Sequence, residues 1–284
     1  MIRQILKDYK IKGGKMDQHF LVDAGALDQI VKTASLEPSD IVLEIGGGIG
    51  NLSERIASHV QKLIIIELDP QMVAVLKDRL AVFPNVEIIL ENVMDVDLQT
   101  LGFNKIVANL PYSISSDVTL KLLQQPFDMA VLMYQYEFAK RLTAVAGGKD
   151  YGRLSVHVQY KTEAAFVFKV PKGSFEPAPK VDSAVVRLLS RSTAYPVKNE
   201  SFFFDVTKAL FSQRRKKIKN TLLSSLSNVP RLKEILDDLS EKSFDSHIFE
   251  NQTVGDILSR RAEELPPADI AHLSNLIYEQ IRQG

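Results

Sequence analysis

The string from Asn109 to Tyr112 carries the side chains of this sequence that are best suited to chemistry on a nucleobase. An exocyclic amine is a poor nucleophile because its lone pair is delocalised into the ring. Acceptors directed at its two hydrogens favour a more tetrahedral nitrogen, and the Asn109 side-chain oxygen and the Leu110 carbonyl can be those acceptors. Pro111 fixes its own φ and favours an extended Leu110, while Tyr112 can stack on the base. The string therefore suits methyl transfer by positioning and polarisation, with no general base needed before attack.

A glycine-rich turn follows the expected strand 41–45. In an open α/β sheet such a turn lies at the edge where ligands bind, and glycines let the backbone approach a ligand closely. The dinucleotide-binding pattern fails because Asn51 stands three positions after Gly48, where a glycine is required. The next expected strand ends in a carboxylate about 20 residues on, which suits the two hydroxyls of a ribose. An adenosine-containing cofactor is therefore predicted, with candidate ligands Glu44, Gly46, Gly48 and Glu67.

Short β-branched runs alternate with longer segments of helical periodicity up to about residue 135. The expected strands are 41–45, 62–68, 86–90, 105–108 and 128–133, and the expected helices are 51–58, 70–82 and 115–124. This alternation predicts an α/β fold with a Rossmann-like parallel sheet. Two more strands are expected at 165–170 and 181–189. Beyond a linker at 191–199 the pattern is helical, which predicts a domain 1–192 followed by a small all-helical domain 193–284.

The composition is that of an ordinary globular protein, with 284 residues, 45% hydrophobic and 25% charged. The absence of cysteine excludes disulfides and thiolate metal sites, and the five histidines are scattered, so no metal is expected. No apolar run has the roughly 18 residues of a membrane helix, so no membrane contact is expected. The basic N-terminal segment lacks the apolar region of a signal peptide. We therefore expect a cytoplasmic protein.

Charge is balanced overall but unevenly distributed. The net charge is zero, which argues against coating of nucleic acid through bulk charge. Five of the six residues from Arg214 to Lys219 are basic, and an acidic stretch begins at Glu234. The basic run is either a solvated helix face or a contact with nucleic-acid phosphates, and its charge alone does not decide between them.

The order of these motifs resembles that of the small-subunit ribosomal RNA adenine dimethyltransferases, the KsgA family, and most of all its archaeal members. The resemblance covers nearly the whole chain. Residues 17–21, at the end of the N-terminal segment 1–24, resemble the first cofactor motif of the family. The other matching blocks are 44–50, Glu67, 109–112, 133–141, 150–155, 175–183 and 211–220.

The resemblance implies S-adenosylmethionine as the methyl donor, with S-adenosylhomocysteine as the product. The implied targets are two adjacent adenosines near the 3′ end of small-subunit ribosomal RNA, in an immature small ribosomal subunit. Such bases lie in a loop, where they can be splayed out and stacked on aromatic side chains. Tyr112 and Phe175 would form that sandwich, although either ring can instead be ordinary core.

Further site residues follow from the resemblance. The implied cofactor ligands, besides those already named, are Gln18, His19, Leu21, Leu68, Asn92, Val93 and Asn109. The implied RNA-binding residues are Arg153, Arg214, Arg215, Lys216 and Lys217, the last four on a helix. Glu91 and Asn92 depart from the usual Gly-Asp of the family. The Asn92 amide oxygen can still accept from the adenine amine, whereas Glu91 is unfavourable if its position requires a positive φ.

Two other functions stay open at this point. A DNA adenine methyltransferase would share the nucleoside site and the 109–112 chemistry, but the C-terminal block argues against it. A ribosome-assembly factor would need the fold and RNA contacts but no chemistry, and the intact 109–112 string argues against that as its sole role. We expect the protein to act as a monomer.

Overall fold

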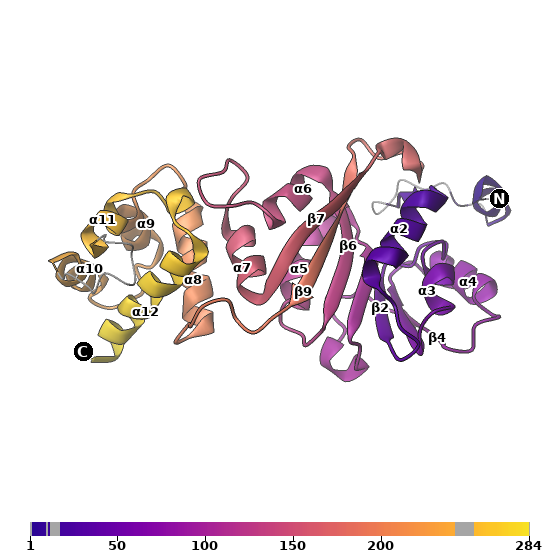
Figure 1. Ribbon diagram of the computed structural model, residues 1–284, viewed down its shortest axis with the longest axis horizontal. Helices are drawn as coiled ribbons and strands as arrows, with labels where there is room; N and C mark the ends of the chain where they lie inside the picture. Colours follow the sequence, from indigo (N-terminus) through magenta and orange to yellow (C-terminus); the bar gives the residue numbers. More distant parts are fainter. Residues whose placement is uncertain (1, 10, 12–17, 242–252, 284) are drawn as a thin grey trace. The chain divides into compact units, whose positions relative to one another are not determined.

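The computed structural model describes residues 2–9, 11, 18–241 and 253–283 (Figure 1). The chain divides into two compact units, Met1–Lys140 with Glu163–Arg191, and Arg141–Thr162 with Ser192–Gly284. The predicted boundary therefore misplaced residues 141–162, which belong to the helical unit. Tyr151, Val156 and Tyr160 are the reason, because these side chains are buried in the hydrophobic cluster of the C-terminal helices.

The first unit is built on a seven-stranded sheet with the order β4-β3-β2-β5-β6-β9-β7. Strands β2 to β6 pair in parallel, and β9 is antiparallel to β6. The strands are β2 (Ile41–Ile45), β3 (Lys62–Glu67), β4 (Val86–Leu90), β5 (Lys105–Asn109), β6 (Met129–Gln135), β7 (Thr162–Val170) and β9 (Ser183–Ser190). From β2, the chain adds β3 and β4 on one side and β5 and β6 on the other, so the strand order changes direction between β2 and β5. Ligands bind at the carboxyl ends of the strands at such a point.

The central strands read as apolar runs because both faces of the sheet are covered. On one face, Met133 of β6 lies in a buried cluster with Leu27 and Ile30 of α2. On the opposite face, Tyr134 hydrogen bonds through its hydroxyl to Thr119 of α5 at 2.9 Å. Figure 1 shows α2 and α5 on either side of the sheet. The helices of this unit are α1 (Ile2–Asp8), α2 (Ala24–Ala34), α3 (Ser53–Ala57), α4 (Pro70–Arg79), α5 (Ser115–Leu122) and the start of α6 (Tyr136–Leu142).

A two-stranded sheet joins two distant motifs of the first unit. Strand β1 (Phe20–Leu21) pairs antiparallel with β8 (Phe175–Glu176), and Leu21 stands opposite Phe175. The His19 ring nitrogen Nδ1 also lies 2.9 Å from the Pro177 carbonyl oxygen. The first cofactor motif is therefore fixed to the block 175–183.

The second unit is helical in its described part. It contains α7 (Arg153–Lys161), α8 (Glu200–Ser212), α9 (Ile218–Ser225), α10 (Leu232–Glu241), α11 (Val254–Ser259) and α12 (Pro267–Gln283). Asn199 caps α8 by accepting from the Phe202 amide at 2.8 Å. In the ranges that the structure describes, no helix has the length and apolar character of a membrane span. The same ranges contain no group of three or more His, Asp or Glu side chains arranged to hold a metal ion.

Candidate functional site

The turn after β2 brings the backbone to the edge of the sheet. Gly46 and Gly48 have φ values of 77° and 54°, which side-chain-bearing residues rarely adopt. A Cβ on Gly48 would also lie 3.2 Å from the Phe20 ring, and one on Gly47 would lie 2.7 Å from the Ile65 side chain. Glycine is therefore needed here both for conformation and for space.

Glu67 is held in a fixed position at the end of β3. Its carboxylate accepts from the Gly48 amide at 2.9 Å and from the Asp69 amide at 3.0 Å. Burial raises its pKa, and the amide hydrogen bonds partly offset that effect. Each carboxylate oxygen has a second lone pair, so Glu67 can accept two further hydrogen bonds from a ligand.

Glu44 is the most deeply buried acid of the site, with 1% of its surface exposed. Loss of hydration, together with the neighbouring charge of Glu67, raises its pKa to about 8. Among the described residues, no hydrogen-bond partner is found for its buried Oε2 atom. Such an orphaned acceptor at the wall of a cavity suits a cationic or hydrogen-bond-donating ligand.

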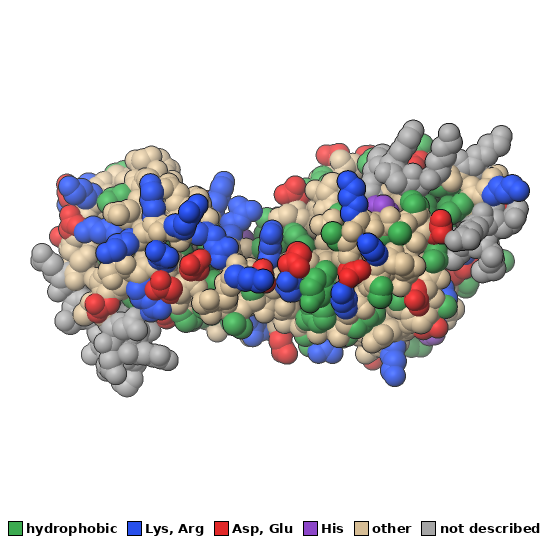
Figure 2. Space-filling model, turned by 90° about the horizontal axis from the view of Figure 1, so that it is seen from above, with side chains coloured by type: hydrophobic (Ala, Val, Ile, Leu, Met, Phe, Trp, Pro, Cys, Tyr) green, Lys and Arg blue, Asp and Glu red, His purple; other side chains and the backbone are tan. Residues whose placement is uncertain are grey.

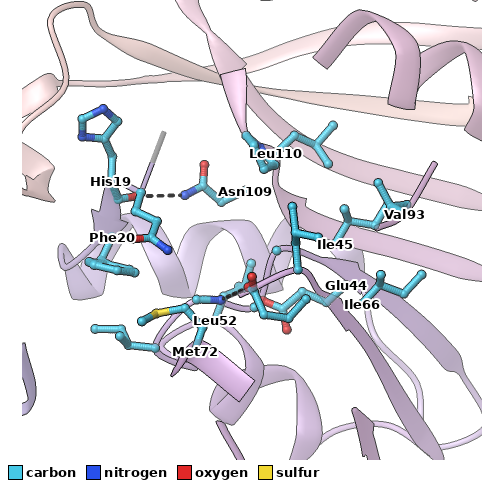
Figure 3. Close-up of a pocket in the computed structure, with 18 of the residues that line it drawn as sticks. His19, Phe20, Glu44, Ile45, Leu52, Ile66, Met72, Val93, Asn109 and Leu110 are labelled. Atoms are coloured by element: carbon cyan, nitrogen blue, oxygen red, sulfur yellow. Dashed lines mark hydrogen bonds between the residues drawn. The ribbon is translucent and has the colours of Figure 1, made fainter. Parts of the chain in front are cut away.

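Asn109 is the last residue of β5, one residue beyond the expected end of that strand. Its Nδ2 atom donates to the His19 carbonyl at 3.4 Å. Figure 3 shows that this contact turns the side-chain oxygen away from His19. The sequence did not predict that the His19 carbonyl positions Asn109. Every residue has a backbone carbonyl, so the residue type does not show which one accepts this hydrogen bond.

Tyr112 is tethered at its far end. Its hydroxyl lies 2.6 Å from the Ser183 hydroxyl, and its ring is stacked on His19 with the centroids 6.0 Å apart. Pro111 has φ −57°, the value that its ring favours, and ψ 132°. Ser183 was also missed as a site residue, although it lies within the matching block 175–183.

The two unusual residues after β4 are accommodated without strain. The φ of Glu91 is not positive, so this position does not require glycine. Its carboxylate accepts from the Asn92 amide at 2.9 Å, while the Asn92 side-chain oxygen accepts from the Met94 amide at 3.0 Å. That oxygen keeps a second lone pair for a ligand, but it is less available than an unengaged carboxylate would be.

These residues line one cavity of about 310 Å³. Apolar side chains of Ile45, Ile66 and Met72 form part of its wall beside the two buried carboxylates (Figure 3). A small number of polar groups in a mostly apolar cavity is typical of a cofactor site. All predicted cofactor ligands line it, namely Gln18, His19, Leu21, Glu44, Gly46, Gly48, Glu67, Leu68, Asn92, Val93 and Asn109, and so do Leu110, Pro111 and Tyr112. The donor set fits a nucleoside with a cationic tail.

Phe175 does not line this cavity, which contradicts its predicted place opposite Tyr112. Only 3% of its surface is exposed, and it packs in the cluster that contains Leu21 and Leu27. The physical reason is its register in β8, opposite Leu21 of β1, which is also buried in that cluster. Of the two readings that the sequence left open, the core position is the one observed.

Residues 214–217 of the basic run lie between α8 and α9, not on a helix as expected, whereas Lys219 lies on α9. Arg214 donates through both terminal nitrogens to the Lys149 carbonyl at 3.2 Å and pairs with Glu263 at 3.2 Å. Lys219 pairs with Asp237 of the acidic stretch at 2.6 Å. Arg215, Lys216 and Lys217 are exposed, and Arg153 begins α7 in the same unit. Arg214 is therefore a structural contact as well as a candidate RNA ligand.

Replacing Glu67 by alanine is expected to act chiefly on cofactor binding. Two ribose hydrogen bonds would be lost, each worth about 0.5 to 1.5 kcal/mol net and more if charge-assisted. Calorimetric titration with S-adenosylmethionine should therefore show a rise in Kd of about fivefold or more. An unchanged Kd would show that Glu67 does not contact the ribose. Glu87→Ala, on the exposed surface of β4, is the matched control.

Comparison with known sequences gives one consistent result. A family described as "Ribosomal RNA adenine dimethylase" matches residues 12–243. A protein of Methanosarcina mazei named "Probable ribosomal RNA small subunit methyltransferase A" is 50% identical over 281 residues, covering 98% of both chains. A protein of Methanococcoides burtonii with the same name is 45% identical over the same share of both chains.

Solved structures agree with the sequence comparison. A dimethyladenosine transferase from Plasmodium falciparum matches with a TM-score of 0.76 and 29% identity, covering 94% of this chain and 98% of that one. The 23S rRNA methyltransferase ErmE matches with a TM-score of 0.61 and 28% identity, covering 91% and 99%. Both similarities extend beyond the sheet into the helical unit.

Proposed function

We propose, since the chain belongs to the ribosomal RNA adenine dimethylase family, that it dimethylates two adjacent adenosines near the 3′ end of small-subunit ribosomal RNA. S-adenosylmethionine is the methyl donor, as in this class of methyltransferases. The observation that carries the proposal is the placement of Asn109 at the cavity that contains Glu44 and Glu67. Its side-chain oxygen is oriented to receive a base amine beside a nucleoside site.

The chain supplies orientation and polarisation. The bound cofactor would provide an electrophilic methyl group on a sulfonium. Glu67 would bind the ribose, and Glu44 would face the positively charged part of the cofactor. Neither carboxylate is required to remove a proton from the target, because the amine attacks with its own lone pair and loses a proton afterwards.

In the first transfer the target amine would donate its two hydrogens to the Asn109 side-chain oxygen and the Leu110 carbonyl, and in the second its one remaining hydrogen to one of these acceptors. These contacts favour a tetrahedral nitrogen, so they strengthen in the transition state and lower the barrier. Tyr112 would stack on the adenine, with its own orientation fixed by the hydroxyl contact to Ser183 at 2.6 Å. One face of the base is covered in this way, and Phe175 is not needed for the stacking.

The small subunit is preferred as substrate over the large one. The archaeal relatives that are 42–50% identical are named for the small subunit, whereas the neighbour named for 23S rRNA is 28% identical. We infer that the physiological substrate is an immature small subunit in the cytoplasm, bound by a monomer. The helical unit would dock this particle, and Lys and Arg side chains gather on its face shown in Figure 2.

Methyl transfer from labelled S-adenosylmethionine tests the proposal. The protein is incubated separately with unmodified small subunits, naked small-subunit RNA, large-subunit RNA and duplex DNA. Label confined to the small subunit or its RNA is expected. Label in duplex DNA would favour a DNA adenine methyltransferase, and label in large-subunit RNA would move the target to the other subunit. Stable subunit binding without label would leave an assembly factor as the remaining function.

Neutralising Arg215, Lys216 or Lys217 is expected to weaken RNA binding broadly and make it less salt-dependent. Each lost phosphate contact should lower the slope of log affinity against log salt by roughly 0.7 to 0.9. Filter binding to small subunits at several salt concentrations measures this slope. Arg214→Gln should in addition lower the unfolding temperature, because the Lys149 carbonyl and Glu263 lose their partner. If the salt slope were unchanged in the variants of all three exposed residues, the basic run would be a solvated surface that does not contact RNA.

A further inference from the structure

An aromatic surface lies on the first unit at the end of β6. Tyr136 follows the last residue of that strand and begins α6. Its ring meets Phe166 of β7 edge to face, with the centroids 6.0 Å apart. Phe166 is 39% exposed, which is unusual for so large an apolar side chain on the edge strand of a sheet. A face of the unit that includes exposed hydrophobic side chains among charged ones is seen in Figure 2.

Two lysines are gathered at this surface. The Nζ atoms of Lys140 and Lys169 lie 5.0 Å and 5.1 Å from the Tyr136 ring centroid. Each also pairs with a carboxylate at 2.7 Å, Lys140 with Glu137 and Lys169 with Asp182. An ammonium has three hydrogens, so one ion pair leaves donors for a phosphate oxygen. The hydrogen bond to Asp182 raises the pKa of Lys169, which keeps it charged at neutral pH.

Two consecutive residues, Asp182 and Ser183, contact this surface and Tyr112. Ser183 of β9 contacts the Tyr112 hydroxyl at 2.6 Å. The preceding residue, Asp182, accepts from the Tyr136 amide through its carbonyl at 2.9 Å and holds Lys169 through its carboxylate. The aromatic surface also lies at the same edge of the sheet as Asn109, because Met133, three residues before Tyr136, pairs with Asn109. A nucleotide that flanks one stacked on Tyr112 would therefore approach the sheet at this edge.

We propose that Phe166, Lys169 and Tyr136 form a docking surface for the RNA strand that flanks the target adenosine. This inference rests on the proposed function. Phe166 stacks on the neighbouring base, and Lys169, positioned over Tyr136, binds the intervening phosphate. Exposed aromatic rings beside cations are the combination that binds single-stranded nucleic acid without a strict sequence requirement. The surface would hold the strand so that the target base enters the site from a fixed direction.

The mixture of polar and apolar groups on this surface favours RNA over an apolar protein partner. A protein that covered Phe166 would also take the Lys169 ammonium and the Asp182 carboxylate out of water. Removing charged groups from water is costly even when they are paired. An RNA strand would cover the ring with a base, while its phosphate and the Lys169 ammonium stay in contact with water.

Phe166→Ala and Lys169→Gln test the surface, each with a matched control. Lys62→Gln removes an exposed lysine that also pairs with a carboxylate, Glu87, at 2.6 Å. Val82→Ala truncates a 78% exposed apolar side chain on the same unit. Dissociation constants for unmodified small subunits are measured over a range of salt, together with kcat, KM and the cofactor Kd of each folded variant.

Phe166→Ala is expected to raise the subunit Kd and KM roughly 5- to 150-fold with an unchanged salt slope, since a stacked base releases no counterions. Lys169→Gln should lower the slope by about 0.7 to 0.9. Neither should change the cofactor Kd, and both controls should match the wild type. If the wild type methylates small subunits while both test variants match the controls, the docking surface is overturned and the proposed function stands. If the wild type methylates no adenosine in small subunits, both proposals are overturned.

Discussion

Asn109→Ala is expected to lower kcat about 100- to 1,000-fold while the cofactor Kd changes far less. The expected loss is that of one polarising hydrogen-bond group in an enzyme site. Among the described residues, the hydrogen bond found for this side chain is the long Nδ2 contact of 3.4 Å to the His19 carbonyl, so its removal should leave the cavity wall in place. Single-turnover methylation at saturating cofactor, with calorimetry for cofactor binding, separates the two effects.

Asn109→Asp is the informative companion variant. It keeps an acceptor of the same size but replaces the donor to the His19 carbonyl with an oxygen, which repels that carbonyl. Its rate should therefore fall as well, although the acceptor is retained. A loss of cofactor binding large enough to explain the whole rate defect of Asn109→Ala would contradict the polarising role.

Glu44→Gln is expected to stabilise the cofactor-free protein increasingly as the pH rises from about 5 to 8. The folded-state pKa of Glu44 is about 8, against 4.5 for an ordinary glutamate, because burial disfavours the charged form. The folded state therefore binds the proton more tightly than the unfolded state does. The stability that this proton contributes is fully present below about pH 4.5 and is lost as the pH rises through about 8.

The size of this effect is bounded by the pKa difference. At about 1.4 kcal/mol per pKa unit, the contribution of Glu44 amounts to at most roughly 4 to 5 kcal/mol. The glutamine variant lacks this dependence, so the difference in unfolding free energy between variant and wild type should grow with pH. Urea unfolding at a series of pH values measures it. Parallel curves for the two proteins would show that Glu44 titrates normally and is not held neutral.

The sheet and the cofactor site were largely predictable from local patterns. Strands 41–45 and 86–90 were predicted with the bounds that the structure has, because short runs of apolar and β-branched residues are typical of strands. The glycine turn and the carboxylate of Glu67 could be placed at one edge from strand order alone. A ligand role could be predicted even for Asn92, which stands where the family usually has aspartate, since an amide oxygen accepts hydrogen bonds as a carboxylate does.

The errors came from long-range packing. Phe175 has a register set by Leu21, which is 154 positions earlier in the chain, and no local pattern contains that pairing. The segment 141–162 joined the helical unit because Tyr151 and Tyr160 pack there, although it lies between strands in sequence. The basic run has helical periodicity, but its residues 214–217 form a turn, which Arg214 fixes through the Lys149 carbonyl. The orphaned oxygen of Glu44 could likewise be found only in three dimensions.

Nucleoside analysis of the methylated RNA tests the central claim most directly. Unmodified small subunits are incubated with the protein and S-adenosylmethionine, and the 3′-terminal RNA fragment is digested and analysed by mass spectrometry. Two adjacent N6,N6-dimethyladenosines in that fragment are predicted for the wild type, and Asn109→Ala should leave the same adenosines unmodified over the same time. Methyl groups on another base, on the ribose or at another site in the RNA would contradict the account.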